Sequence, residues 1–311
     1  MEDTQVRPES SNLTNDAVIS RAPTEVLASA APSAQVTSAS CPTCAAGQAT
    51  GQASPPSYAY VIGHIEPRFP LLSLEKELAQ AIKRTSGTVD LGDHATMQKV
   101  LSDPNNRYIV RQLCWVLRVQ GIETYILVPR DPADYLLLLE AYRASPNPGD
   151  LDVVIGIRGP MAPPTMCNGL VVPILIFDQI YSFDRESLLG ALKAPKDTES
   201  KKFTAGAAEM LDRIIQQSDN AGDSDADRAL NYLAVRYDQI YATAANAFAH
   251  NSSFTSIDVL PSALSGTRKI VQVVFSFTSR ETDVASKYFV RVDVTEEFPF
   301  LVTKMSPYYD R

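Results

Sequence analysis

Four cysteines are the residues of this chain whose type and spacing could do chemistry. Cys41 and Cys44 form a close pair in the string CPTC, whereas Cys114 in RQLCWV and Cys167 in TMCNGL each stand alone. A C-x-x-C pair places two thiolates within reach of one cation, and two further thiolates complete a tetrahedral zinc shell. No histidine lies near the pair, so a complete shell would consist of four thiolates.

Other interpretations of the cysteines remain open. They can be four unrelated thiols, two of them in an N-terminal arm and two buried as small apolar side chains. The second C-x-x-C or the H-x-H partner that usually accompanies a zinc site is missing from the sequence. A thioredoxin-like redox role is disfavoured, because the pair does not lie at a strand-to-helix junction of a βαβ unit.

Composition and charge limit the classes of partner. The chain has 311 residues, of which 45% are hydrophobic and 21% charged, as in ordinary globular proteins. A net charge of −8 argues against sequence-independent binding to nucleic acid, which needs a basic face. No apolar run is long enough to span a membrane, and the first residues lack the features of a secretory signal. We therefore expect a cytoplasmic protein without nucleic-acid or membrane partners.

The cysteines must be positioned by two unlike parts of the chain. The first part is rich in Ala, Ser, Thr, Pro and Gln and has no sustained periodicity. Such a composition buries too little apolar surface to offset the entropy of ordering. It predicts a disordered arm over 1–40, followed by a CPTC zinc knuckle and connector over 41–57. Residues 58–311 show no repeat and predict an α+β domain, with a single mixed or antiparallel sheet and flanking helices.

Hydrophobic periodicity and breaker residues predict the elements of this domain. Strands are expected at 58–65, 107–120, 123–131, 151–159, 170–183, 268–280 and 286–298. Helices are expected at 73–84, 94–103, 132–144, 184–192, 203–217 and 227–250. The string EPRFP predicts a bend, because prolines lack a donor. Cys114 then lies in a hairpin strand, and Cys167 lies in a proline-rich loop. The aromatic C-terminal string SPYYDR is expected to pack against the domain.

Familiar catalytic motifs are absent from the sequence. There is no phosphate-binding or dinucleotide-binding glycine motif, no G-x-S-x-G and no H-E-x-x-H. The three histidines, His64, His94 and His250, are far apart, and each is expected at the surface or satisfied in the core.

Several charged or polar residues occupy unusual places beside apolar segments. They are Asp178, Gln179 and Asp184 after PILIF, Glu296 and Glu297 before FPFLV, and Arg111, Arg118 and Arg130 around the first hairpin. They could form a polar cleft that recognises a peptide. They could equally form internal ion pairs and helix caps, because perturbed charges also serve structure.

Several long strings together resemble the C-terminal domain of cyanobactin maturation proteases of the PatG/PatA type. They are EPRFP, RQLCWV, ETYILVPRDP, MCNGL, FDQIYSFD, DNAGDSDADRALNYLAVRYDQIY and YFVRVDVTEEFPFLVTKMSPYYDR. In that family the domain is appended to subtilisin-like proteases that process and macrocyclise ribosomal peptides, and it has long been a domain of unknown function. The resemblance also implies the four-cysteine pattern of Cys41, Cys44, Cys114 and Cys167, and with it a structural zinc ion.

The subtilisin-like module of the family is missing, because no G-T-S-x-A segment is present. The resemblance therefore implies a non-catalytic accessory protein in ribosomal peptide maturation. It would bind a precursor peptide, or a subtilisin-like or cyclodehydratase maturation protein, and a peptide could add to a sheet edge. The alternative is an enzyme with an unrecognised peptide-modifying site near Asp178 and Asp184 or near Arg130 and Asp131. A third possibility is a stand-alone structural or regulatory protein.

Overall fold

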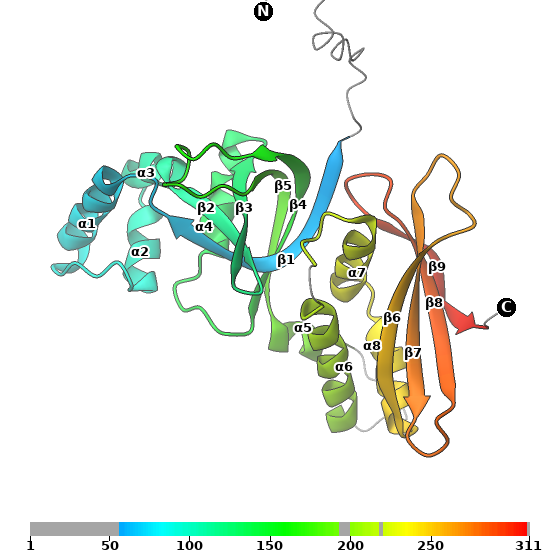
Figure 1. Ribbon diagram of the computed structural model, residues 1–311. Helices are drawn as coiled ribbons and strands as arrows, with labels where there is room; N and C mark the ends of the chain where they lie inside the picture. Colours follow the sequence, from blue (N-terminus) through cyan, green and yellow to red (C-terminus); the bar gives the residue numbers. More distant parts are fainter. Residues whose placement is uncertain (1–55, 193–199, 218–219, 310–311) are drawn as a thin grey trace, which may run out of the picture. The chain divides into compact units, whose positions relative to one another are not determined.

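The computed structural model describes residues 56–192, 200–217 and 220–309 (Figure 1). The predicted arm over 1–40 and the CPTC pair lie outside the described residues. The described chain forms helices and two sheets, which confirms the predicted α+β class. The expectation of a single sheet was wrong, because the strands are divided between a closed five-stranded barrel and a four-stranded sheet.

The barrel is formed by the first five strands. They are β1 (Ser57–Arg68), β2 (Cys114–Val119), β3 (Ile122–Pro129), β4 (Asp150–Met161) and β5 (Pro173–Asp184). Their order around the barrel is β1-β2-β3-β5-β4. Neighbouring strands are antiparallel, except for the parallel pair β3 and β5. The barrel closes because the first half of β1 pairs with β4 and its second half pairs with β2.

Strand β1 extends into the string predicted to bend and ends at Arg68, so that the chain leaves the strand only at Phe69 and Pro70. Pro67 is paired opposite Trp115, within the part of β1 that follows Gly63 and no longer pairs with β4. A proline nitrogen is tolerated in a strand where it faces a side without a partner strand. Where β1 leaves β4, the buried carboxylate of Asp152 accepts the backbone N–H of Ile65 at 3.0 Å. This bond supplies a partner that the barrel ladder lacks at this point.

Four helices pack with the barrel around one hydrophobic core. They are α1 (Leu72–Ser86), α2 (His94–Leu101), α3 (Arg107–Gln112) and α4 (Tyr135–Ala141). Helix α3 occupies the start of a predicted strand. Asp103 accepts the N–H of Asn105 at 2.9 Å and so begins the 3-10 turn that leads into α3. Ile109 and Val110 of α3 are buried in the core, which favours the helix over an extended segment.

The second sheet has helices packed on one face, in a separate hydrophobic core. The helices that contribute to this core are α5 (Arg185–Ala191), α6 (Ser200–Ile215), α7 (Asp225–Arg236) and α8 (Gln239–Ala249). The strands are β6 (Ser252–Pro261), β7 (Ile270–Ser279), β8 (Ala285–Asp293) and β9 (Phe300–Tyr308), paired antiparallel in this order. The predicted β7–β8 hairpin is confirmed. Strands β6 and β9 extend it on both sides, and β9 contains the start of the C-terminal string expected to pack against the domain.

The helix predicted over 227–250 is divided into α7 and α8. Tyr237 leaves the helical conformation between them, with φ −127° and ψ 91°. The break places the hydroxyl of Tyr237 against β9, where it accepts the N–H of Met305 at 2.9 Å. A continuous helix would agree with the periodicity of apolar residues over 227–250. It would, however, lack this hydrogen bond between distant parts of the chain.

Helix α7 is bonded to β1 and to the chain that follows β8 through buried polar side chains. The amide of Asn231 donates to the carbonyl of Tyr60 in β1 at 2.8 Å. The guanidinium of Arg228 donates to the carbonyl of Val294 at 2.6 Å and also to that of Glu296. The chain that follows β8 is thereby fixed on α7.

Gly156 lies at a bulge between β4 and β5 where the two backbones approach closely. A Cβ atom added there would contact the carbonyl oxygen of Ile176 and lie 2.6 Å from Cα of Phe177. We expect Gly156→Ala to lower the free energy of unfolding by about 2 kcal/mol or more, because the backbone of β5 would have to move. Urea unfolding followed by circular dichroism measures this change.

Gly190 provides the matched control for this prediction. It lies in α5, and an added Cβ would meet no atom within 4 Å. Gly190→Ala should be neutral or stabilising by up to ~1 kcal/mol, because alanine favours helix. Equal effects of the two substitutions would contradict the close approach of β4 and β5.

Candidate functional site

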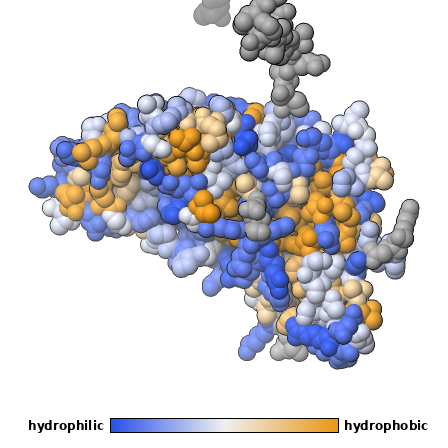
Figure 2. Space-filling model, viewed as in Figure 1, coloured by the Kyte–Doolittle hydropathy of each residue, from blue (hydrophilic) through white to orange (hydrophobic). Residues whose placement is uncertain are grey.

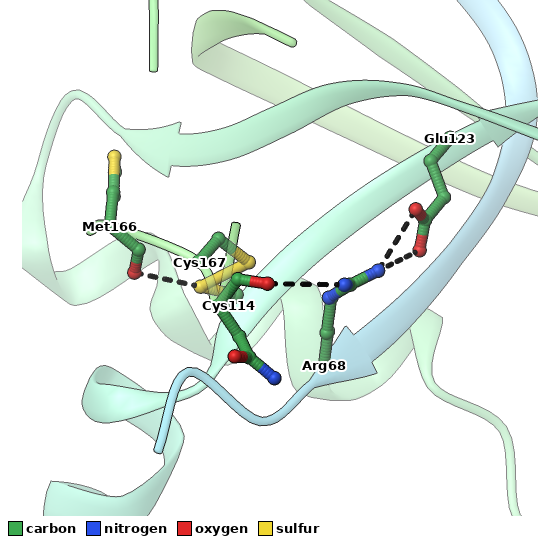
Figure 3. Close-up of a disulfide and its surroundings, with 6 residues drawn as sticks. Arg68, Cys114, Glu123, Met166 and Cys167 are labelled. Carbon is green, nitrogen blue, oxygen red and sulfur yellow. Dashed lines mark hydrogen bonds and ion pairs between the residues drawn. A yellow bond between two sulfur atoms is a disulfide. The ribbon is translucent and has the colours of Figure 1, made fainter. Parts of the chain in front are cut away.

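The structure brings Cys114 and Cys167 together, although 53 residues separate them in the sequence. Their sulfur atoms are joined in a disulfide, and their Cα atoms are 5.9 Å apart (Figure 3). Cys114 begins β2, and Cys167 lies in the loop between β4 and β5. Both side chains are buried. The other two predicted ligands, Cys41 and Cys44, lie outside the described residues.

The loop that carries Cys167 is held in place by its own turns and by Arg68. Asn168 and the glycine after it have positive φ angles of 48° and 84°, which reverse the chain beside Cys167. Arg68, at the end of β1, donates two hydrogen bonds to the carboxylate of Glu123, at 2.8 and 2.9 Å. It also donates to the carbonyl of Asn168 at 3.5 Å (Figure 3). The loop is therefore bonded to the barrel next to the sulfur atoms.

The two sulfur atoms lie in mainly apolar surroundings. Val116, Ile126 and Ala162 are buried around them, and the carbonyl oxygen of Met166 is 3.4 Å from the sulfur of Cys114. Within the described parts of the chain, no three His, Cys, Asp or Glu side chains are grouped so that they could hold a metal. This pair can supply two sulfur ligands, and a complete shell would need two more from outside the described residues.

A second cluster joins three charged residues that the sequence analysis singled out separately. Arg130 follows β3, Asp178 lies in β5, and Glu297 lies in the loop after β8. The guanidinium of Arg130 is 2.7 Å from the carboxylate of Asp178 and 3.4 Å from that of Glu297. One carboxylate oxygen of Glu297 is buried and has no hydrogen-bond partner among the described residues. The cluster connects the barrel to the chain that precedes β9.

The surroundings of Glu297 favour its protonated form. Burial, and after it the neighbouring carboxylate of Asp178, raise the pKa of Glu297 to about 7, although the positive charge of Arg130 opposes the shift. A carboxyl group with such a pKa exchanges its proton near neutral pH, as a general acid or base must. It equally makes the contact between the barrel and the β8–β9 loop sensitive to pH.

The structure does not bring Asp178 and Asp184 together as a pair of acids. They are six residues apart on β5, which corresponds to about 20 Å along a strand. Asp184 instead caps α5 by accepting the N–H of Ser187 at 3.0 Å. Asp131 caps the turn before α4 by accepting the N–H of Ala133 at 2.8 Å. These two carboxylates therefore have the structural roles that the sequence left open.

Two of the three histidines, by contrast, share a cavity of about 310 Å³. His64 and His94 line it together with the buried carboxylates of Asp150 and Asp152. Asp150 pairs with Arg143 at 3.1 Å, and Asp152 accepts the hydrogen bond that completes the β1 ladder. Both carboxylates therefore have structural partners. This juxtaposition was not predictable from local sequence patterns, because the fold brings β1 close to the start of α2.

The outer face of the C-terminal sheet carries a groove of about 670 Å³. The cross-strand register places Gln272 beside Leu260 and Arg291, and Val274 beside Phe289. The groove is lined by Leu260, Pro261, Ala263, Gln272, Phe289, Arg291, Pro307, Tyr308 and Tyr309. Sequence analysis missed this groove because it did not predict β6 and β9, which form its sides.

Arg291 is the charged group of this groove. Its guanidinium carbon lies 4.7 Å from the centre of the Phe289 ring, and its side chain forms no ion pair with any described residue. Apolar side chains are also exposed nearby, at Phe298, Phe300 and Val302. Figure 2 shows a further apolar surface beside α7, on the side of the second sheet where the helices pack. The groove thus offers aromatic surface next to an uncompensated positive charge.

The raised pKa of Glu297 predicts a pH-dependent stability. The folded state holds a proton that the unfolded state releases near pH 4.5, so stability should fall as the pH rises from about 4.5 through about 7. Solvent screening limits the loss to about 1 to 2 kcal/mol. Glu297→Gln should remove this loss and make the protein more stable than the wild type at pH 8. Urea unfolding between pH 5 and pH 8 measures both effects.

Glu296→Gln is the control, because Glu296 lies in the same loop and its side chain is exposed. It should leave the pH dependence of the wild type unchanged. A pH dependence that survives Glu297→Gln would show that another group is responsible.

The family model described as PatG C-terminal matches residues 197–308. A solved structure named "PatG Domain of Unknown Function" has a similar fold, with a TM-score of 0.66 and 20% sequence identity. The match covers 81% of this chain and 98% of that one. A search of curated proteins gave no match.

Among the described helices, none has the length and apolarity needed to cross a membrane. The family match covers α6, α7, α8 and the four strands of the second sheet, and the structural match extends the similarity in fold to most of the chain. The resemblance to the PatG C-terminal domain is therefore confirmed, in sequence over residues 197–308 and in fold over 81% of the chain.

Proposed function

We propose that this chain is a non-catalytic accessory protein in the maturation of a ribosomally made, cyanobactin-like peptide. The outer groove of the C-terminal sheet binds an extended precursor peptide. The observation that carries this proposal is the juxtaposition of Phe289 and Arg291 on an open sheet face, within the segment that matches the PatG C-terminal family. A subtilisin-like or cyclodehydratase maturation protein is the alternative partner for the same surface.

The closed barrel restricts where a peptide strand could bind. A barrel has no free edges, so β6 and β9 are the edge strands at which a peptide could extend a sheet. On β9, Lys304 and Pro307 are features that discourage strand addition, and the N–H of Met305 is already bonded to Tyr237. We therefore place the peptide across the sheet face, where side chains rather than backbone groups make the contacts.

The lining of the groove indicates what kind of peptide it would bind. Phe289, Tyr308 and Tyr309 offer aromatic surface, which contributes strongly to binding in interfaces. Arg291 offers a guanidinium that can bind a carboxylate in bidentate geometry. A peptide segment with an acidic residue next to apolar residues satisfies both requirements.

The peptide proposal predicts the effects of two substitutions. Phe289→Ala and Arg291→Gln should each weaken binding of the precursor peptide about tenfold or more, because each removes a central contact. Isothermal titration calorimetry with the full chain measures the affinity, and circular dichroism verifies that each variant is folded.

Ile122→Ala is the matched control, because this apolar side chain is exposed on the barrel, away from the outer face of the second sheet. It should bind the peptide as the wild type does. No heat with the precursor peptide or with either maturation protein would refute the accessory role. Binding that is insensitive to both groove substitutions would refute the groove as its site.

We also propose that Cys41, Cys44, Cys114 and Cys167 hold a structural zinc ion. The proposal is supported by the meeting of Cys114 and Cys167 and by the capacity of a C-x-x-C pair to supply the other two thiolates. Zinc binding requires these cysteines to be reduced, and we propose the cytoplasm as the compartment because thiols remain reduced there. Four thiolates leave no open coordination position, so the ion would serve the fold rather than a reaction.

Zinc content tests this proposal directly. Protein purified under reducing conditions without chelator should contain about one zinc ion per chain, measured by mass spectrometry of the metal. Cys44→Ser and Cys114→Ser should each reduce the content to near zero, because each removes one ligand of the shell. A zinc-free protein with two fewer titratable thiols than its four cysteines would instead support a lasting disulfide.

A further inference from the structure

A small pocket lies between α2, α3 and the start of α4, far along the chain from the groove of the second sheet. Its volume is about 260 Å³, and Leu101, Val110 and Leu139 form a buried apolar floor. Pockets for larger ligands usually measure roughly 300–1,000 Å³, so this one suits a single amino-acid side chain better than a whole cofactor.

Two arginines line the same pocket. Arg107 and Arg111 are one helical turn apart on α3, so they lie on one face of the helix. Both are exposed, and neither side chain forms a hydrogen bond or ion pair with a described residue. Asp103 and Asp131 precede the turns that lead into α3 and α4. Their carboxylates accept backbone N–H groups of those turns and form no ion pair with the two arginines. The pocket therefore carries two uncompensated positive charges in a chain whose net charge is −8.

This arrangement calls for an anionic ligand. Like charges one turn apart destabilise a helix by a few tenths of a kcal/mol, and a carboxylate bound between them would remove that repulsion. Guanidinium groups bind carboxylates in bidentate geometry, and the hydrogen bonds are strong because both partners are charged. The apolar floor requires that the carboxylate be attached to an apolar group.

A hydroxyl group on the pocket wall identifies the ligand further. Ser102 donates its hydroxyl hydrogen to the carbonyl of Gln98 at 2.7 Å. The oxygen of Ser102 can therefore act only as an acceptor toward a ligand. An acceptor does not suit a carboxylate, but it suits the amide N–H of a peptide.

We propose that this pocket binds the free C-terminal end of a peptide whose last residue is apolar. The terminal carboxylate lies between Arg107 and Arg111, the last side chain contacts the floor formed by Leu101, Val110 and Leu139, and the last N–H donates to Ser102. This site does not depend on the proposed function, because it lies on a different part of the fold from the groove around Phe289.

A labelled peptide tests the proposal on the full chain. The probe consists of four glycines and a C-terminal leucine, with fluorescein at its N-terminus, and its binding is followed by fluorescence anisotropy. The free acid should bind, and the peptide with an amidated C-terminus should bind about tenfold more weakly, because it lacks the charge. Arg107→Gln and Arg111→Gln should each weaken binding of the free acid about tenfold.

Arg213→Gln is the matched control, because Arg213 is an exposed arginine of α6 outside the pocket. This variant, and the groove variant Phe289→Ala, should bind the probe as the wild type does. Circular dichroism verifies that the Arg107 and Arg111 variants are folded, as expected for exposed side chains.

Three results would each overturn the proposal. They are no anisotropy change at millimolar protein, equal binding of the acid and the amide, and equal binding by the wild type and both pocket variants. Competition by hexanoate as strong as that by the unlabelled peptide would also overturn it, because hexanoate shares the apolar carboxylate but has no amide N–H for Ser102.

Discussion

The buried guanidinium of Arg228 is the interaction on which the arrangement around the C-terminal sheet depends. A buried charge costs several kcal/mol unless hydrogen bonds satisfy it. Arg228 is 2% exposed, and it donates to carbonyl groups of Val294, Glu296 and Glu297. These bonds fix the path of the chain between β8 and β9. They place Glu297 beside Arg130, and they allow β9 to complete the groove on the opposite face of the sheet.

The closed barrel and the open second sheet have different roles in this fold. The barrel leaves no edge for another strand, and its backbone groups are satisfied by its own ladders and by Asp152. It serves as the frame that brings the loop of Cys167 to β2 and orients the helices around the small arginine pocket. The second sheet has one face covered by helices and presents Phe289 and Arg291 on the other. The surface that could bind a partner is therefore the face of the second sheet that no described helix covers.

The sequence predicted the elements whose signals are local. The alternation in β7 and β8 is readable because it depends on neighbouring residues. Errors occurred where distant contacts override local preference. The segment around Ile109 reads as a strand, but it is helical because it packs on α1 and α2. The helix predicted through Tyr237 is broken because that residue bonds to β9.

The sequence by itself determined the α+β class, the resemblance to the PatG C-terminal domain and the identity of the four candidate sulfur ligands, because these depend on composition, periodicity and residue type. Only the tertiary structure decided which side chains meet. It joined Cys114 to Cys167, placed Arg130 between Asp178 and Glu297, and grouped nine residues around the groove. These contacts between distant residues depend on strand register and barrel closure, which many weak contacts across the chain decide together. A short segment of sequence does not contain that information.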